Sequence, residues 1–206
     1  MPSKHKEAPS FVRRKFFDGL RSFQDFEART EQLSNTKEVG DAFEILVEAY
    51  LHLNPVLKAK DVWLVGGVPS RIRTRLNLPA DTKGIDIVAT NASASKTVTI
   101  QCKTSRKGTK VWILGEKSED FISEHHFYVF VNLGAENERP SYHIVPSKVV
   151  AKTIKTGHSD WLKGTSKSGK PRKDSAIRNF SDKNDDYLEK WELLGLCESL
   201  KQKKFG

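Results

Sequence analysis

The sequence predicts an α/β domain with a central mixed β-sheet flanked by helices. The first observation is a helical stripe over residues 39–53, where apolar side chains recur every three or four positions. The second is a series of short segments rich in β-formers between residues 62 and 145, separated by turn-forming sequences. The third is the return of helical patterning after Pro146-Ser147. Helices before and after a group of strands are typical of a layered α/β domain, not of a sandwich or a bundle.

The amino-terminal part is expected to contain an arm and two helices. Residues 1–15 are polar and basic, and we expect them to form a mobile arm. A first helix is predicted over residues 16–33, because its aromatic and aliphatic residues follow a helical spacing. The second helix, over residues 39–53, is the clearest in the chain and ends at Asn54-Pro55, since proline disfavours a helical conformation of the residue before it.

The remaining elements follow from periodicity and turn residues. We expect strands at residues 62–65, 71–76, 84–90, 97–104, 127–132 and 142–145. We expect helices at residues 117–124, 147–154 and 185–194. We therefore predict three parts: an arm with the first helix (1–35), a core (36–155), and a basic loop with a helical extension packed on the same domain (156–206).

Charge points to a polyanionic partner. Lys and Arg number 35 against 26 Asp and Glu, a formal net charge of +9 for 206 residues. Such an excess favours nucleic acid, although a soluble basic protein without such a partner has the same composition. The two cysteines show no pair spacing, and no apolar segment reaches membrane-spanning length. These features predict a cytoplasmic protein with no membrane partner.

Polar residues on two neighbouring strands form the candidate chemical site. In the strand over 97–104 the apolar side chains alternate, so that Gln101 and Lys103 share the opposite face, about 6.6 Å apart. On the preceding strand Asp86 stands between two isoleucines and points away from the core. Two strands joined by a turn can bring these three side chains around one point. An acid, an amide and a lysine are the groups expected around a hard cation.

The chemistry of magnesium explains why these residue types belong together. Mg²⁺ takes oxygen ligands, here the Asp86 carboxylate, the Gln101 amide oxygen and the backbone carbonyl of Cys102. Lys103 can stabilise developing charge or help to deprotonate an attacking water. Glu44 lies beside the apolar stripe of the helix over 39–53, where it can lean toward the site. The alternative is an exposed polar face on an ordinary hairpin.

Three short motifs resemble those of the PD-(D/E)xK nuclease superfamily. They are Gly-Asp-Ala-Phe-Glu (40–44), Gly-Ile-Asp-Ile-Val (84–88) and Ile-Gln-Cys-Lys (100–103), and the resemblance covers roughly residues 38–132. The Mrr-type restriction enzymes and the Holliday-junction resolvases are the most similar branches. The resemblance implies a core of a helix, three strands, a helix and a strand (αβββαβ). It also implies roles for Glu44 as the helix acid, Asp86 as the metal-binding aspartate, and Gln101 with Lys103 as the third motif.

The motifs depart from the usual pattern in two places. Gln101 replaces the customary acid, as in Mrr-type members, and removes one negative charge. Gly-Ile-Asp replaces the Pro-Asp element, which leaves Asp81 as an alternative to Asp86, and Glu48 is the alternative to Glu44.

The resemblance implies a function as well as a fold. It implies a Mg²⁺-dependent endonuclease, with Mn²⁺ able to substitute, that cuts duplex DNA as a homodimer in restriction or phage defence. A Holliday-junction resolvase, a repair nuclease and a non-catalytic DNA-binding module with a decayed site are the alternatives.

Two basic segments are candidate DNA contacts. If residues 71–76 form a strand, Arg71, Arg73 and Arg75 share one face at intervals of about 6.6 Å, near the phosphate repeat of one DNA strand. The alternative is an edge strand kept soluble by charge. The second segment is a loop rich in Gly, Ser and Lys that we expect to order on DNA; its basic residues are Lys163, Lys167, Lys170, Arg172 and Lys173. The alternative is a solvated loop.

Overall fold

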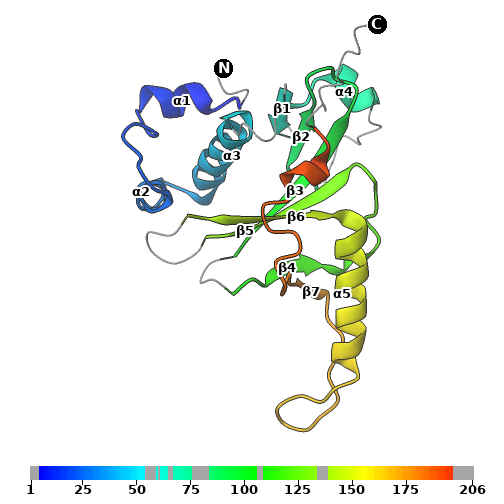
Figure 1. Ribbon diagram of the computed structural model, residues 1–206. Coiled ribbons are helices and arrows are strands. Elements are labelled where there is room, and N and C mark those ends of the chain that lie inside the picture. The colour runs from blue at the N-terminus through cyan, green and yellow to red at the C-terminus, as the bar shows by residue number, and fades with distance from the viewer. Residues whose placement is uncertain are drawn as a thin grey trace, which may run out of the picture. The chain divides into compact units, whose positions relative to one another are not determined.

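The computed structural model describes residues 5–53, 59, 61–64, 67–75, 84–105, 109–133 and 139–196 (Figure 1). Its elements are, in chain order, α1 (Ala8–Arg13), α2 (Phe23–Thr30), α3 (Thr36–Leu53), β1 (Asp61–Leu64), α4 (Ser70–Arg75), β2 (Ile87–Thr90), β3 (Thr97–Ser105), β4 (Trp112–Gly115), η2 (Glu116–Glu119), β5 (His126–Asn132), β6 (Ser141–Pro146), α5 (Ser147–Leu162), β7 (Ile177–Phe180) and η3 (Trp191–Leu194).

The strands form a five-stranded sheet in the order β1-β2-β3-β5-β6, and β4 pairs with β7 in a second, two-stranded sheet. The predicted α/β class with a central mixed sheet flanked by helices is therefore confirmed. The chain divides into two compact units, residues 1–99 with 194–206, and residues 100–193.

The first unit begins with a helix where a mobile arm was expected. Helix α1 lies within that arm, and its Phe11 side chain is only 1% exposed. Phe11 packs edge-on against Phe16, with ring centroids 5.0 Å apart, in a cluster that includes Phe26 and Ala42. The prediction of a mobile arm was wrong over residues 8–13, because one aromatic side chain in a basic segment is enough to anchor it to a core.

Only part of the predicted helix over residues 16–33 is helical. Helix α2 begins after Ser22, whose side chain accepts a hydrogen bond from the backbone N–H of Asp25 in a capping box. Before it, Lys15 and Gly19 have positive φ values of 52° and 70°, which no helix contains. The Arg29 guanidinium donates to the carbonyls of Phe16 (2.6 Å) and Asp18 (2.7 Å). These bonds stabilise the turn before α2. The aromatic residues before α2, whose spacing predicted a helix, therefore pack into the core from a turn.

Helix α3 agrees with the prediction and extends it at the amino-terminal end. The Asn35 side chain accepts from the Glu38 backbone N–H at 2.9 Å, which satisfies one of the free donors at the start of the helix. The buried face of the helix consists of Ala42, Ile45, Glu48 and Leu51. Helix α3 packs against β1, which pairs antiparallel with β2 from Asp61↔Thr90 to Leu64↔Ile87. The predicted strand over 84–90 is shorter than expected, because regular pairing begins at Ile87.

The arginine-rich segment is a helix and not the predicted strand. In α4 the backbone N–H of Arg73 and of Ile72 donates to the Pro69 carbonyl, and the Thr74 hydroxyl donates to the Ser70 carbonyl. Successive residues of a helix turn by about 100°, so Arg71 and Arg75 share a face while Arg73 points to the opposite side. The alternation in the sequence was one of charge only, with no buried face behind it. The predicted ladder of three arginines along one strand face is therefore wrong.

The second unit contains the carboxy-terminal strands and α5. Strand β5 pairs antiparallel with β6 from Phe127↔Pro146 to Asn132↔Ser141, close to the predicted positions. The core includes Trp112, Tyr128, Phe130 and Phe180, with Phe130 and Phe180 stacked at 4.4 Å. The predicted helix at 117–124 is the short 3-10 turn η2, and α5 runs about two turns beyond its predicted end. Strands β4 and β7 were not predicted.

The segment after β7 replaces the helix predicted over residues 185–194. Asp185 and Glu189 have positive φ values of 59° and 53°, which interrupt any helix. The segment runs along β6 instead: the Ile144 N–H donates to the Tyr187 carbonyl, and the Glu189 N–H to the Tyr142 carbonyl. Only the 3-10 turn η3 is helical in this segment. The apolar spacing at residues 187–194 that suggested a helix results from packing against a strand.

Candidate functional site

Asp86 lies one residue before β2, in the first unit. Its neighbours Ile85 and Ile87 are buried, whereas Asp86 itself is exposed, as the predicted alternation requires. The backbone therefore presents this carboxylate on the polar side of the strand. Asp81, the alternative acid, lies outside the described residues.

Gln101, Cys102 and Lys103 lie consecutively on β3, in the second unit. Val98 and Ile100 are fully buried, so that Gln101 and Lys103 stand on the other face of the strand, both half-buried. Cys102 is also half-buried, so the alternation between buried and accessible residues is less pronounced here than toward the start of the strand. A half-buried amide and ammonium on one strand face are sheltered from bulk water yet open to a ligand.

Helix α3 carries two acids with different surroundings. The Glu44 side chain is 54% exposed and lies 3.2 Å from His5 Nε2, a histidine that also lies 3.6 Å from Asp41. Glu48 lies one turn later and is only 1% exposed, on the face formed by Ala42, Ile45 and Leu51. The structure thus leaves Glu48 as a real alternative to Glu44.

The predicted set of ligands fits a magnesium ion by its chemistry. Asp86 offers an accessible carboxylate, Gln101 an amide oxygen, and Cys102 a backbone carbonyl. All three are hard oxygen donors, and a set with one or two carboxylates leaves room for the waters that Mg²⁺ retains. The Cys102 thiol does not belong to this set, because soft sulfur ligands favour other metals.

The predicted DNA-contacting lysines differ in what surrounds them. Lys163 is paired with Asp160 at 2.7 Å, and Arg172 donates to two backbone carbonyls. Lys167, Lys170 and Lys173 are exposed, and no ion pair involves them in the part of the chain that the structure describes. The five basic residues therefore do not form one uniform set.

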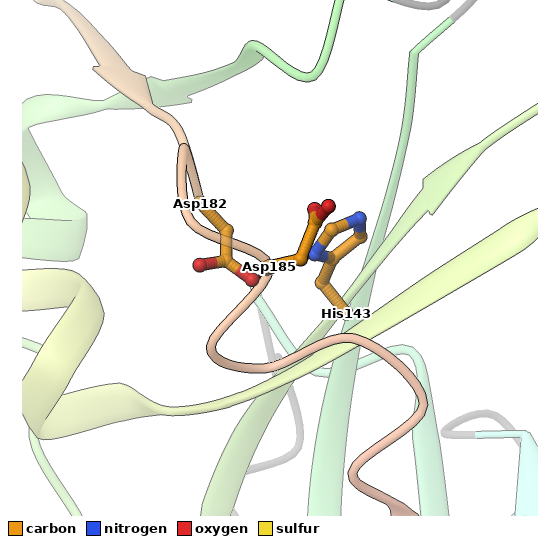
Figure 2. A group of neighbouring side chains, drawn as sticks. All are labelled: His143, Asp182 and Asp185. Atoms are coloured by element: carbon orange, nitrogen blue, oxygen red, sulfur yellow. Dashed lines mark hydrogen bonds and ion pairs between the residues drawn. The ribbon is translucent and has the colours of Figure 1, made fainter.

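A second cluster, not predicted from the sequence, lies between β6 and the loop after β7. Figure 2 shows that this loop brings Asp182 and Asp185 alongside His143. Their ligand-type atoms lie within 4.8 Å of one another, which raises the question of a metal site. His143 and Asp182 are 39 positions apart, so that no sequence spacing indicated their contact.

The two carboxylates of this cluster have hydrogen-bond partners without a metal, whereas the buried His143 Nε2 has none in the described part of the chain. His143 Nδ1 donates to Asp182 Oδ2 at 2.7 Å, and the backbone N–H groups of Asp186 and Tyr187 donate to the same carboxylate. Both oxygens of Asp185 accept from Lys110 Nζ, at 2.8 and 2.7 Å. A metal on the Asp185 carboxylate would have to displace Lys110. The cluster is therefore better understood as a buried anchor for the segment after β7.

The fold and the sites together define a class of protein. A mixed α/β domain with an exposed aspartate before one strand and a Gln-x-Lys pair on the next has the features of a restriction-endonuclease-like fold. Residues 54–126 match a family model of the Mrr catalytic type, described as restriction endonuclease. This match confirms the resemblance to the PD-(D/E)xK nuclease superfamily, supports a nuclease and implies DNA as its substrate.

The matched segment contains Asp86, Gln101 and Lys103, whereas Glu44 precedes it. No curated protein and no solved structure matches the chain. Among the described residues, no helix is long and apolar enough to cross a membrane.

Proposed function

We propose that this protein is a magnesium-dependent endonuclease that hydrolyses phosphodiester bonds of duplex DNA in restriction or phage defence. The observation that carries the proposal is the match of residues 54–126 to a restriction-endonuclease family, because this segment contains Asp86, Gln101 and Lys103 in the order of the motifs. A cytoplasmic location and a homodimer belong to the same proposal, since cutting both strands at a symmetric site takes two active sites.

The proposed roles follow from the chemistry of each group. Asp86, Gln101 and the Cys102 carbonyl hold the metal, and the helix acid, Glu44 or Glu48, assists through the metal or through a water. Mg²⁺, or Mn²⁺ in its place, supplies polarisation of the scissile phosphate and a more acidic water. Lys103 donates hydrogen bonds to the phosphate oxygens on which negative charge develops, and it positions the attacking water.

The basic side chains are proposed to hold the substrate. Arg71 and Arg75 lie on one face of α4 and are exposed, whereas Arg73 is half-buried. We assign phosphate contact to Arg71 and Arg75. Arg73 joins them only if its guanidinium reaches the DNA backbone from the opposite face of α4. Lys163, Lys167, Lys170, Arg172 and Lys173 supply a second basic surface.

A plasmid-cleavage assay tests the catalytic assignment. The native protein is expected to cut supercoiled plasmid with Mg²⁺ and to stop cutting with chelator. Lys103→Ala is expected to lower the rate at least 100-fold, because loss of one group that stabilises transition-state charge costs this much in other enzymes. Lys117→Ala is the matched control: Lys117 is exposed, lies in the same matched segment and carries the same charge. Cutting by Lys103→Ala at the native rate would sink the assignment.

The glutamine of the third motif offers a second test with a gain of function. Gln101→Glu restores the customary carboxylate and is expected to lower the Mg²⁺ concentration needed for half-maximal cutting. Parallel substitutions Glu44→Gln and Glu48→Gln identify the helix acid by which of them abolishes cutting. Binding to duplex without cutting under any of these conditions favours the decayed module. Preference for a four-way junction over duplex favours the resolvase.

A further inference from the structure

The basic loop that we expect to order on DNA forms a hairpin-like turn in the structure. Residues 164–173, which we call the finger, form a turn that is closed by an isolated β-bridge between Thr165 and Pro171. Its tip is closed by hydrogen bonds from the Ser166 N–H to the Lys170 carbonyl (2.8 Å) and from the Gly169 N–H to the Ser166 carbonyl (2.9 Å). Gly169 has a φ of +74°, which few other residues adopt without strain. The finger therefore has a defined shape before any partner binds.

The base of the finger is held by a stack centred on Trp161. The indole stacks with the His158 ring, whose centroid is 5.5 Å away, and the Arg172 guanidinium lies over the indole, 4.9 Å from its centroid. Arg172 also donates to the carbonyls of Trp161 (2.8 Å) and Thr165 (3.0 Å). A side chain at Gly164 would place its Cβ 3.2 Å from Arg172 Nη1, so that the glycine makes room for the guanidinium. Arg172 thus serves as a scaffold for the finger.

The finger presents lysines that form no ion pair among the described residues. Residues 163–173 contain four lysines, one arginine and no acid. Lys163 is neutralised by Asp160, and Arg172 is occupied at the base, which leaves Lys167, Lys170 and Lys173 exposed. Helix α5, about 24 Å long for its 16 residues, carries the finger at its carboxy-terminal end, and Figure 1 shows it projecting beyond that end. A projecting group of lysines without an ion pair in the described part of the chain is suited to a polyanion.

We propose that the finger enters the major groove of duplex DNA and grips the phosphates that border it through Lys167, Lys170 and Lys173. This inference rests on the proposed function, which makes DNA the substrate. The major groove is about 12 Å wide and admits a two-stranded ribbon, whereas the minor groove, about 6 Å wide, does not. Because the finger is ordered in advance, binding costs little conformational entropy. The contact holds the enzyme on DNA and takes no part in cutting.

Binding measurements without metal separate this role from catalysis. Kd for a fluorescent duplex is measured in chelator over a series of salt concentrations, for the native protein and for Lys167→Ala/Lys170→Ala. The double variant is expected to bind about tenfold more weakly or worse, and the slope of log K against log salt is expected to fall by about 1.8, since each lost phosphate contact contributes about 0.9. Lys117→Ala/Lys152→Ala removes the same charge from exposed positions outside the finger and is expected to keep the native Kd and slope.

A charge-preserving variant tests the scaffold. Arg172→Lys retains the positive charge and loses the planar group that lies on Trp161 and bonds two carbonyls. It is expected to bind DNA several-fold more weakly with a nearly native salt slope, since the phosphate contacts are kept and only their arrangement is loosened. Circular dichroism of each variant establishes that the fold is retained. A native Kd for Arg172→Lys would refute the role of a preorganised finger.

Groove occupancy is tested with modified duplexes. Glucosylated hydroxymethylcytosine fills the major groove, and netropsin occupies the minor groove. The native protein is expected to bind the glucosylated duplex more weakly and to keep its Kd in the presence of netropsin. The Kd of the finger double variant is expected to change much less on glucosylation. Equal Kd values for the native protein and the double variant, or competition by netropsin alone, would overturn the proposal. Absence of cutting with Mg²⁺ while these binding differences persist would reject the nuclease and leave the finger in place.

Discussion

The anchor formed by His143, Asp182 and Asp185 leads to a prediction about stability. The Asp182 carboxylate accepts three hydrogen bonds, from His143 Nδ1 (2.7 Å), the Asp186 N–H (3.1 Å) and the Tyr187 N–H (2.9 Å). Both His143 and Asp182 are almost completely buried, with exposed fractions of 0% and 4%. In Asp182→Ala three donors lose their acceptor at once, in a place that water reaches poorly.

The magnitude follows from these contacts. Each buried donor left without a partner costs about 1–3 kcal/mol, and Asp182→Ala leaves three of them. Because the loop can relax and admit water, we expect the free energy of unfolding of Asp182→Ala to fall by about 3–5 kcal/mol. For a chain of this size that corresponds to a decrease in Tm of roughly 10 °C. The loss is a large fraction of the ~5–15 kcal/mol that stabilises a typical domain.

Tryptophan fluorescence during urea unfolding is the assay, since the Trp112 ring lies 5.1 Å from His143 and Trp191 lies 5.5 Å from Tyr142. Asp185→Asn is the control. It weakens only the half-exposed pair with Lys110 and keeps a residue type that tolerates positive φ, so a loss below about 1 kcal/mol is expected. A loss below 1 kcal/mol for Asp182→Ala, or equal losses for both variants, would refute the reasoning.

Three further predictions concern the two units separately. Burial lowers the pKa of His126 to about 4, so that on acidification the unfolded chain takes up a proton before the folded chain does. The free energy of unfolding should therefore fall by about 3 kcal/mol as the pH drops from 6.5 to 4. This decrease should be absent in His126→Gln, and a variant with the same pH profile as the native protein would contradict the prediction. Phe11→Ala should cost about 3–5 kcal/mol, whereas Val12→Ala, at a side chain 69% exposed, should cost under about 0.5 kcal/mol in the same urea titration. Arg178→Met should lower the free energy of unfolding by about 3–5 kcal/mol, because it leaves the Glu119 carboxylate of a largely buried ion pair without its partner. A native free energy of unfolding for this variant in the urea titration would show that the pair contributes little.

Elements with a regular, locally encoded pattern were predictable. The apolar stripe of α3 and the alternation around Asp86 and along the first part of β3 follow from periods of 3.6 and 2 residues, which are properties of the backbone. The same local patterns contain the three motifs, so that Asp86, Gln101 and Lys103 were named without any tertiary information. Their roles in metal binding and catalysis stay predictions, as does the division of the chain into three parts.

Segments whose conformation depends on distant partners were not predictable. Alternation of charge at α4 resembled a strand, because no local signal distinguishes a solvated helix of six residues from an edge strand. The apolar residues at 187–194 suggested a helix until their true partner, β6, was known. In both places the competing local conformations differ by little free energy. Hydrogen bonds to β6 decide the conformation of residues 187–189, whereas the hydrogen bonds of α4 lie within its own turn.

The sequence by itself determined the α/β class, the motif residues and the excess of basic charge. Only the tertiary structure decided how that charge is used. It pairs Lys163 with Asp160, places Arg172 on Trp161, and leaves Lys167, Lys170 and Lys173 without an ion pair in the described part of the chain. The physical reason is that periodicity specifies which way a side chain points from its own backbone. Which group it then meets depends on parts of the chain that the local pattern does not contain.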